Sequence, residues 1–123
     1  MVIVEEIKWL SENGLEAEVT ISDEAIKLIC FAHPFNGQTG DIVPLPLYAI
    51  ETTHILISDK NAFFLKRINE GFEYYIIGKV KDKDGQIVCI NNIEIELDVP
   101  FPGDIKNDEF VSFVCSRLDL MST

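Results

Sequence analysis

The chain has 123 residues, 47% of them hydrophobic and 10% aromatic, which is the composition of a globular protein and not of a disordered one. At this length one core buries roughly two thirds of the unfolded surface, so we expect a single mainly-β domain over residues 1–123. Asp and Glu outnumber Lys and Arg by 21 to 10, and the net charge of −11 excludes the usual nucleic-acid binder, because phosphate backbones are bound by clustered cations.

Cysteine content and hydropathy are those of a cytoplasmic protein. The three cysteines are an odd number in apolar surroundings, whereas a disulfide framework needs pairs. The chain does not open on a secretion signal, and its longest apolar run is much shorter than a membrane span. We therefore expect a cytoplasmic localisation and no membrane contact.

The first third of the chain predicts three strands. Residues 15–22 alternate apolar and polar side chains, which is the period of a strand with one buried face. Residues 2–10 are apolar but less regular, and the turn residues 11–14 should join the two runs into a hairpin. Residues 25–32 are apolar at nearly every position, and their β-branched and aromatic content favours a buried strand over a short helix.

The middle of the chain is less regular. Residues 33–41 contain one proline and two glycines, which predicts a long loop. Prolines at alternate positions of residues 43–47 remove ladder donors, so this stretch is an edge strand or an extended crossing. Residues 48–57 fit either a strand or one short helix, and a turn follows at residues 59–61.

The C-terminal half predicts a meander and a closing strand. Residues 72–80 and 86–91 flank an Asp-Gly pair, a strong hairpin signal. Residues 93–98 alternate strictly and form the clearest half-buried strand of the chain. A second long loop at residues 99–109 then leads to a last strand at residues 110–120.

Seven or eight strands with turns every 8–12 residues predict an antiparallel small barrel or a sandwich. Residues 72–120 resemble the strand succession of an OB-type small barrel, in which Gly78 would suit the bend that such barrels need. The resemblance implies a fold and no ligand, because OB domains that bind nucleic acid carry a basic groove that this chain lacks.

Two acidic strand faces are candidates for acid and base chemistry. Glu94, Glu96 and Asp98 share one face, and Glu16 and Glu18 share another, with neighbouring carboxylates about 6–7 Å apart along the strand. Paired carboxylates at such separations can catalyse glycoside hydrolysis. Nothing in the sequence desolvates either pair, so we interpret both as solvated faces.

Metal and nucleophile motifs are incomplete. Cys30 and His33 could join Cys89 and Cys115 in a zinc site, but the second short ligand pair of such sites is missing, which favours buried cysteines. Residues 82–85 resemble the start of a calcium loop without its terminal glutamate, and a hairpin turn explains them better. We therefore assign no catalytic residue, no cofactor and no metal.

The two long loops are the best candidates for binding, because loops on a rigid β scaffold are where binding residues concentrate. Each carries a phenylalanine that could be exposed as an anchor beside carboxylates, an arrangement common at protein interfaces. The alternative is that both phenylalanines fold back onto the core. The predicted partner-binding residues are Phe35, Asn36, Asp41, Phe101, Asp104 and Asp108.

These features predict a non-enzymatic acidic module that recognises another protein, with a basic surface as the expected partner. Immunity or inhibitor proteins resemble it in charge and size, because blocking a basic nuclease requires matching charge. A small-molecule binder or enzyme using a barrel mouth, with Cys30, His33 and His54 as polar groups, is the first alternative. A structural subunit of a homo-oligomer, whose edge is protected by Pro44 and Pro46, is the second.

Overall fold

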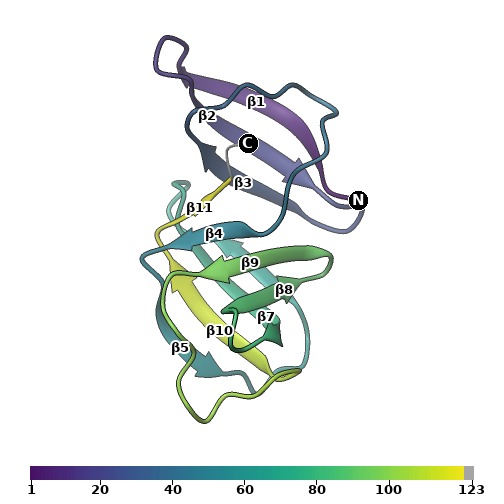
Figure 1. Cartoon of the computed structure of the whole chain (residues 1–123), viewed down its shortest axis with the longest axis vertical. Helices are drawn as coiled ribbons and strands as arrows, with labels where there is room; N and C mark the ends of the chain where they lie inside the picture. Colours follow the sequence, from purple (N-terminus) through teal and green to yellow (C-terminus); the bar gives the residue numbers. More distant parts are fainter. Residues whose placement is uncertain (121–123) are drawn as a thin grey trace.

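The computed structural model describes residues 1–120 and contains eleven strands and no helix within them (Figure 1). The prediction of a mainly-β fold is confirmed, and the short helix considered for residues 48–57 is wrong, because this stretch forms two strands. In chain order the strands are β1 (Ile3–Ser11), β2 (Glu16–Ser22), β3 (Lys27–Ala32), β4 (Leu47–Ile50), β5 (Thr53–Ile57), β6 (Phe64–Arg67), β7 (Tyr74–Asp82), β8 (Ile87–Ile90), β9 (Ile93–Leu97), β10 (Phe110–Cys115) and β11 (Arg117–Asp119).

The first three strands form an antiparallel meander, as their hydrophobic pattern predicts. In β2 the inward residues Ala17, Val19 and Ile21 are fully buried, while Glu16 and Glu18 face outward. The strict alternation of this segment therefore fixes which face of the sheet meets the core.

The second meander, β7 to β9, forms around the Asp-Gly turn that the sequence indicates. Gly78 lies where β8 comes close to β7: a Cβ at this position would be 2.7 Å from the carbonyl oxygen of Cys89 and 2.8 Å from a methyl group of Val88. The glycine is thus required by a close backbone approach, which is one of the reasons for a glycine inside a strand.

All eleven strands belong to one mixed sheet of order β1-β2-β3-β11-β4-β9-β8-β7-β10-β5, with β6 paired to β7. Its end strands β1 and β5 do not pair with each other, so the sheet is not closed into a barrel. The expectation of an antiparallel arrangement is wrong at two places, because β3 pairs with β11 and β4 with β9 in parallel.

The lower part of the sheet nevertheless curls strongly (Figure 1). Only Ser116 separates β10 from β11, and the sheet runs from β11 through β4, β9, β8 and β7 back to β10. In the same way β4 and β5 are one bent stretch: β5 pairs with β10, and β4 pairs with β11. The sequence predicted a single strand over residues 110–120, and the bend at Ser116 was not anticipated.

Asp98 fixes the bend between β4 and β5. Its carboxylate accepts hydrogen bonds from the backbone amides of Glu51, at 2.7 Å, and Thr52, at 3.0 Å. Glu51 has a positive φ of 54°, a conformation that needs such support in a non-glycine residue. Asp98 therefore sets the direction in which β5 leaves the sheet.

One continuous hydrophobic cluster runs through the described residues, from Val4 of β1 to Phe113 of β10 and Leu118 of β11. Phe113 and Leu118 are fully buried, so the two segments on either side of Ser116 anchor both parts of the sheet in the same core. None of the described residues forms a helix of the length and apolarity needed to cross a bilayer.

Candidate interaction surface

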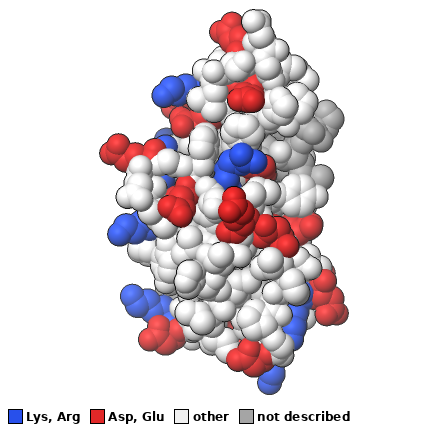
Figure 2. All heavy atoms as spheres, turned by 90° about the vertical axis from the view of Figure 1, so that its left-hand side faces the viewer, with Lys and Arg blue, Asp and Glu red and all other residues white. Residues whose placement is uncertain are grey.

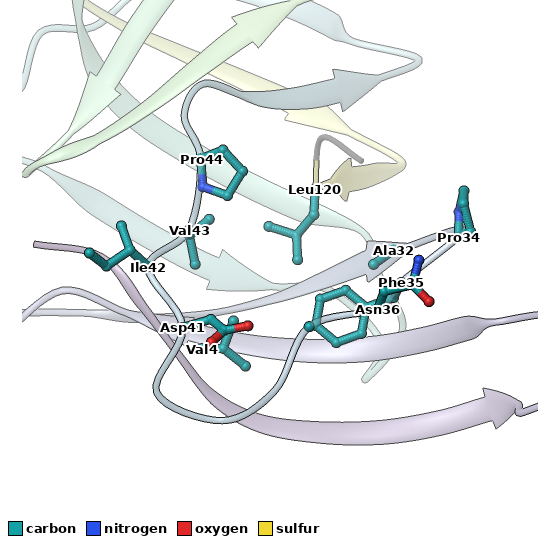
Figure 3. Close-up of a pocket in the computed structure, with 11 residues that line it drawn as sticks. Val4, Ala32, Pro34, Phe35, Asn36, Asp41, Ile42, Val43, Pro44 and Leu120 are labelled. Atoms are coloured by element: carbon teal, nitrogen blue, oxygen red, sulfur yellow. The ribbon is translucent and has the colours of Figure 1, made fainter. Parts of the chain in front are cut away.

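The first predicted loop, residues 33–41, and the stretch that follows it up to residue 46 lie along the N-terminal end of β1. The amide of Val4 donates to the carbonyl oxygen of Asp41 at 2.9 Å, the amide of Gly40 donates to that of Val4 at 2.8 Å, and Ile3 and Ile42 form an isolated bridge. Between the loop and the sheet is an open pocket of about 290 Å³ (Figure 3). This arrangement also covers part of the open edge of β1.

Three predicted binding residues, Phe35, Asn36 and Asp41, line this pocket. Phe35 is half-buried: it packs on the core, and its ring centroid is 5.9 Å from that of Trp9. The Asp41 carboxylate accepts a hydrogen bond from the amide of Gln38 at 2.9 Å and so holds the loop itself. Of these three residues, only Asn36 is exposed, and its side chain forms no hydrogen bond with the described residues.

The second predicted loop, residues 99–109, lies at the opposite end of the molecule (Figure 1). The expectation that Phe101 is an exposed anchor is wrong, because its side chain is only 6% exposed and belongs to the core. Asp104 and Asp108 are exposed, and the amide of Asp108 donates to the carbonyl oxygen of Val80 at 2.8 Å. The six predicted residues therefore do not form one site.

The acidic strand faces contain engaged carboxylates. Glu94 forms an ion pair with Lys81, and Glu18 lies 3.8 Å from the guanidinium of Arg67. For Asp98, burial raises the pKa, but hydrogen bonds from Thr52 and from the amide of Glu51 outweigh it and hold the pKa below its usual value. A carboxylate with a lowered pKa is a poor general acid near neutral pH.

The cysteines lie in apolar surroundings. Cys30 and Cys115 are fully buried, and burial raises the pKa of both thiols, that of Cys115 to about 12. His33 is exposed at the end of β3, and no group of three His, Cys, Asp or Glu side chains within residues 1–120 is arranged to hold a metal ion. Buried thiols of this kind are inert, because the reactive form is the thiolate.

One surface feature was missed by sequence reasoning. Four antiparallel strands lie side by side in the order β5, β10, β7, β6, and their outward side chains form rows across the sheet. One row consists of Leu56, Ser112, Ile77 and Phe64, each directly opposite the next. We call the outward surface of these strands and of the loop at residues 58–63 the β5–β6 face.

The centre of the β5–β6 face is hollow because Ser112 is small and its neighbours in the row are large. Leu56 is 61% exposed and Phe64 46%, and with Phe63 they border a hollow of about 380 Å³. Aromatic pairs support its sides: the Phe64 ring lies 6.0 Å from that of Tyr75. Of the eight large hydrophobic side chains that are exposed within residues 1–120, four line this hollow: Leu56, Ile57, Phe63 and Phe64.

The charges on this face differ from those of the whole chain. The outward strand positions carry Lys79 on β7 and Lys66 on β6 and no carboxylate, although carboxylates outnumber cations two to one in the sequence. Lys60, in the adjoining loop, lines the hollow together with Asp59. In Figure 2, which views the molecule from the side of β5, the lower half has a broad area free of charged residues with cations and carboxylates around it.

Predicted residue Asp108 lies at one end of the β5–β6 face. With Glu109, Lys79 and Phe110 it lines a second hollow of about 310 Å³. The rings of Phe110 and Phe63 are 5.4 Å apart, so this hollow adjoins the loop at residues 58–63. Of the six predicted binding residues, Asp108 therefore borders the β5–β6 face.

The sequence did contain one signal of this face. Residues 56 and 57 are adjacent large apolar side chains on β5, and adjacent residues on a strand point to opposite sides, so one of the two must face outward. A strand with apolar side chains on both sides needs a second covering layer, and the described residues supply none over the row at Ser112.

Fold and surface together define an all-β protein with a charged exterior and one apolar sheet face open to solvent. The chain belongs to the family described as "Uncharacterised conserved protein UCP019853", which matches residues 1–121. Searches of curated proteins and of solved structures gave no match.

Proposed function

We propose that this protein is a non-enzymatic binding module that recognises another protein, and that the β5–β6 face is its contact surface. The observation that supports the proposal is the clustering of Leu56, Ile57, Phe63 and Phe64, all at least 40% exposed, around one hollow. Exposed apolar patches rimmed by polar residues mark interaction sites in soluble proteins.

The form of the patch also fits an interface. A concave centre that accepts one large side chain, surrounded by aromatic rings, is the usual environment of the few residues that dominate binding energy. The buried thiols of Cys30 and Cys115 and the engaged carboxylates of Glu94 and Asp98 favour binding over catalysis, since none is a free reactive group.

An immunity- or inhibitor-type role is one form of this function. The net charge of −11 would attract a basic partner over a distance of about one Debye length, roughly 8–10 Å at physiological salt. In that form the negative field of the whole molecule attracts a partner that is basic overall, and the apolar side chains of the β5–β6 face contact an apolar part of that partner.

Two variants with the same chemical change test the proposal. Leu56→Asp places a carboxylate in the centre of the face, and Leu10→Asp does so at a leucine on β1 that is 47% exposed and lies outside it. Wild type and both variants are used as bait in the lysate of the source cells, and the retained proteins are identified by mass spectrometry at low and moderate salt.

The proposal expects one protein to be retained by the wild type and by Leu10→Asp and lost with Leu56→Asp. Retention by all three baits would place the contact elsewhere, and retention by none at low salt would refute a protein partner. Circular dichroism and thermal unfolding of each bait establish that the variants are folded.

One observation favours a second candidate function. The hollow at Ser112, about 380 Å³, is within the range of roughly 300–1,000 Å³ typical of small-molecule sites. A small-molecule binder would be stabilised against thermal unfolding by its ligand, and Leu56→Asp would remove the shift. Screening a set of metabolites by thermal shift distinguishes small-molecule binding, which would raise the unfolding temperature, from protein recognition.

A further inference from the structure

We propose that the partner segment bound by the β5–β6 face is an extended stretch of another protein in which one large apolar side chain is flanked, two residues away on each side, by carboxylates. The inference rests on the proposed function and specifies the chemistry of the partner. It depends on the positions of three lysines relative to the hollow.

The lysines lie on both sides of the hollow along the strand direction. On β7, Lys79 is two residues beyond Ile77, the floor of the hollow, and Tyr75 is two residues before it. Lys66 of β6 is directly opposite Tyr75. The rows that carry Lys79 and Lys66 are therefore four residues apart, about 13 Å, with the hollow midway between them.

These lysines are free to take new partners. Within residues 1–120, Lys60, Lys66 and Lys79 lie outside ion-pair distance of every carboxylate, whereas Lys27, Lys81, Arg67 and Arg117 each have one. The carboxylates near the face, Asp59, Asp108 and Glu109, lie at its loop end, where Asp108 and Glu109 line the same hollow as Lys79, and none of them is within 4.0 Å of a lysine of the face.

The spacing of the rows fits an extended partner. Alternate residues of an extended chain lie on one side and are about 6–7 Å apart, the same as the spacing of successive rows on the face. An apolar side chain that enters the hollow at Ser112 therefore places residues two before and two after it over the rows of Lys66 and Lys79. Carboxylates at these positions would meet the two ammonium groups.

A polypeptide fits this surface better than a nucleic acid. The aliphatic side chains of Leu56, Ile57 and Ile77 match an apolar side chain, whereas three lysines in a chain of net charge −11 provide little of the counterion release that drives binding to phosphate backbones. A second copy of the chain would bring two lysine-bearing faces together, which is unfavourable for like charges.

The test uses a displayed library of random peptides of about twelve residues, selected on the wild-type protein and then on two variants. Leu56→Asp removes the apolar contact, and the double variant Lys66→Glu/Lys79→Glu inverts the flanking charges. Leu10→Asp is the matched control outside the face. Each selected peptide is titrated against all four proteins at low and moderate salt.

The expected result is enrichment of a large apolar residue with Asp or Glu two positions before and after it. Leu56→Asp should weaken binding by about tenfold or more, which is about 1.4 kcal/mol. The double variant should weaken peptide binding by a similar factor at low salt. At moderate salt it should weaken binding by less, because salt screens exposed ion pairs. Leu10→Asp should bind as the wild type does.

Four outcomes would overturn the inference. They are enrichment of Lys or Arg at the flanking positions, no enrichment at all, a dimer in sedimentation analysis that Leu56→Asp dissociates, and binding of a labelled twenty-nucleotide thymidine strand that depends on Lys66 and Lys79. If the wild type retains a lysate protein that Leu56→Asp loses while the library selects basic peptides, the proposed function stands and this inference fails.

Discussion

Asp23 is a buried carboxylate that joins two turns, and its removal should destabilise the protein. The residue is 3% exposed, and its Oδ1 atom accepts hydrogen bonds from the amides of Ala25, at 2.7 Å, and Ile26, at 2.8 Å. Its Oδ2 atom accepts a longer one, 3.3 Å, from the amide of Asn92. Asp23 thus links the turn after β2 to the turn between β8 and β9.

The size of the effect follows from these three bonds. Asp23→Ala leaves three partly buried amides without their acceptor, and hydrogen bonds to charged groups contribute about 1.5–3 kcal/mol each, less for the long one. Because water can reach part of the opened turn, we expect a loss of about 2–4 kcal/mol in the free energy of unfolding. Asp23→Asn keeps one acceptor oxygen, so its loss should be about 1–2 kcal/mol.

The two variants also predict a pH dependence. Burial raises the pKa of Asp23, but the hydrogen bonds from Ile26, Ala25 and Asn92 outweigh it and leave the pKa below its ordinary value of 3.8. A lowered folded-state pKa contributes stability above pH 3.8, and this contribution is lost as the pH falls through the folded-state pKa. The difference between wild type and Asp23→Asn should therefore be full near pH 6 and shrink below about pH 4.

Urea unfolding followed by circular dichroism, from about pH 6 down to about pH 2.5, measures these differences for wild type and both variants. A gap between wild type and Asp23→Asn that is the same at both ends of this range would refute the role of the ionised carboxylate. A loss below about 0.5 kcal/mol for Asp23→Ala would show that the turn amides find water instead, and the reasoning from burial would be wrong.

Three further predictions concern the core. Phe101→Ala should lower the free energy of unfolding by about 2–4 kcal/mol, because the ring is buried; a urea midpoint like that of the wild type would instead place the ring in solvent. Gly78→Ala should cost more than about 1 kcal/mol by the same assay, because its Cβ would lie 2.7 Å from the carbonyl oxygen of Cys89, and an unchanged midpoint would mean that β8 moves away freely. The thiols of Cys30 and Cys115, whose pKa values are raised by burial, should react with iodoacetamide at pH 8 only as fast as the protein unfolds; rapid labelling of either in the native state would contradict their burial.

Local structure was largely predictable from the sequence. Alternation over residues 15–22 and 93–98 placed β2 and β9 nearly to the residue, and the turn at Asp84-Gly85 placed the hairpin between β7 and β8. Each of these signals acts between neighbours in the chain, where turn chemistry and side-chain period determine the outcome.

The sheet order was not predictable in this way. The parallel pair of β4 and β9 joins Leu47 to Ile95, and β3 meets β11 through Phe31 and Asp119, residues that no local pattern relates. Strand β6 was missed because its four residues, Phe-Leu-Lys-Arg, are two apolar residues followed by two cations and do not alternate in hydrophobicity.

The candidate site was found only in part, for two physical reasons. Two candidate carboxylates are used by the fold: Asp41, expected at a binding rim, holds its own loop, and Asp98, expected on a solvated strand face, accepts hydrogen bonds from amides 46 and 47 residues away in sequence. The hollow at Ser112 exists because a small side chain on β10 lies between large ones on β5 and β7, a relation that appears only when the register is known.

The position of β11 has a consequence for how the protein is made. This strand comes last among the eleven, yet it lies in the middle of the sheet, between β3 and β4. Until residues 110–119 have left the ribosome, the meander of β1 to β3 has no partner strand on its inner edge, and that edge is open to other chains. A nascent chain of this protein therefore needs residues 110–119 before either half of the sheet is protected, so chaperone binding should persist until β11 has been synthesised.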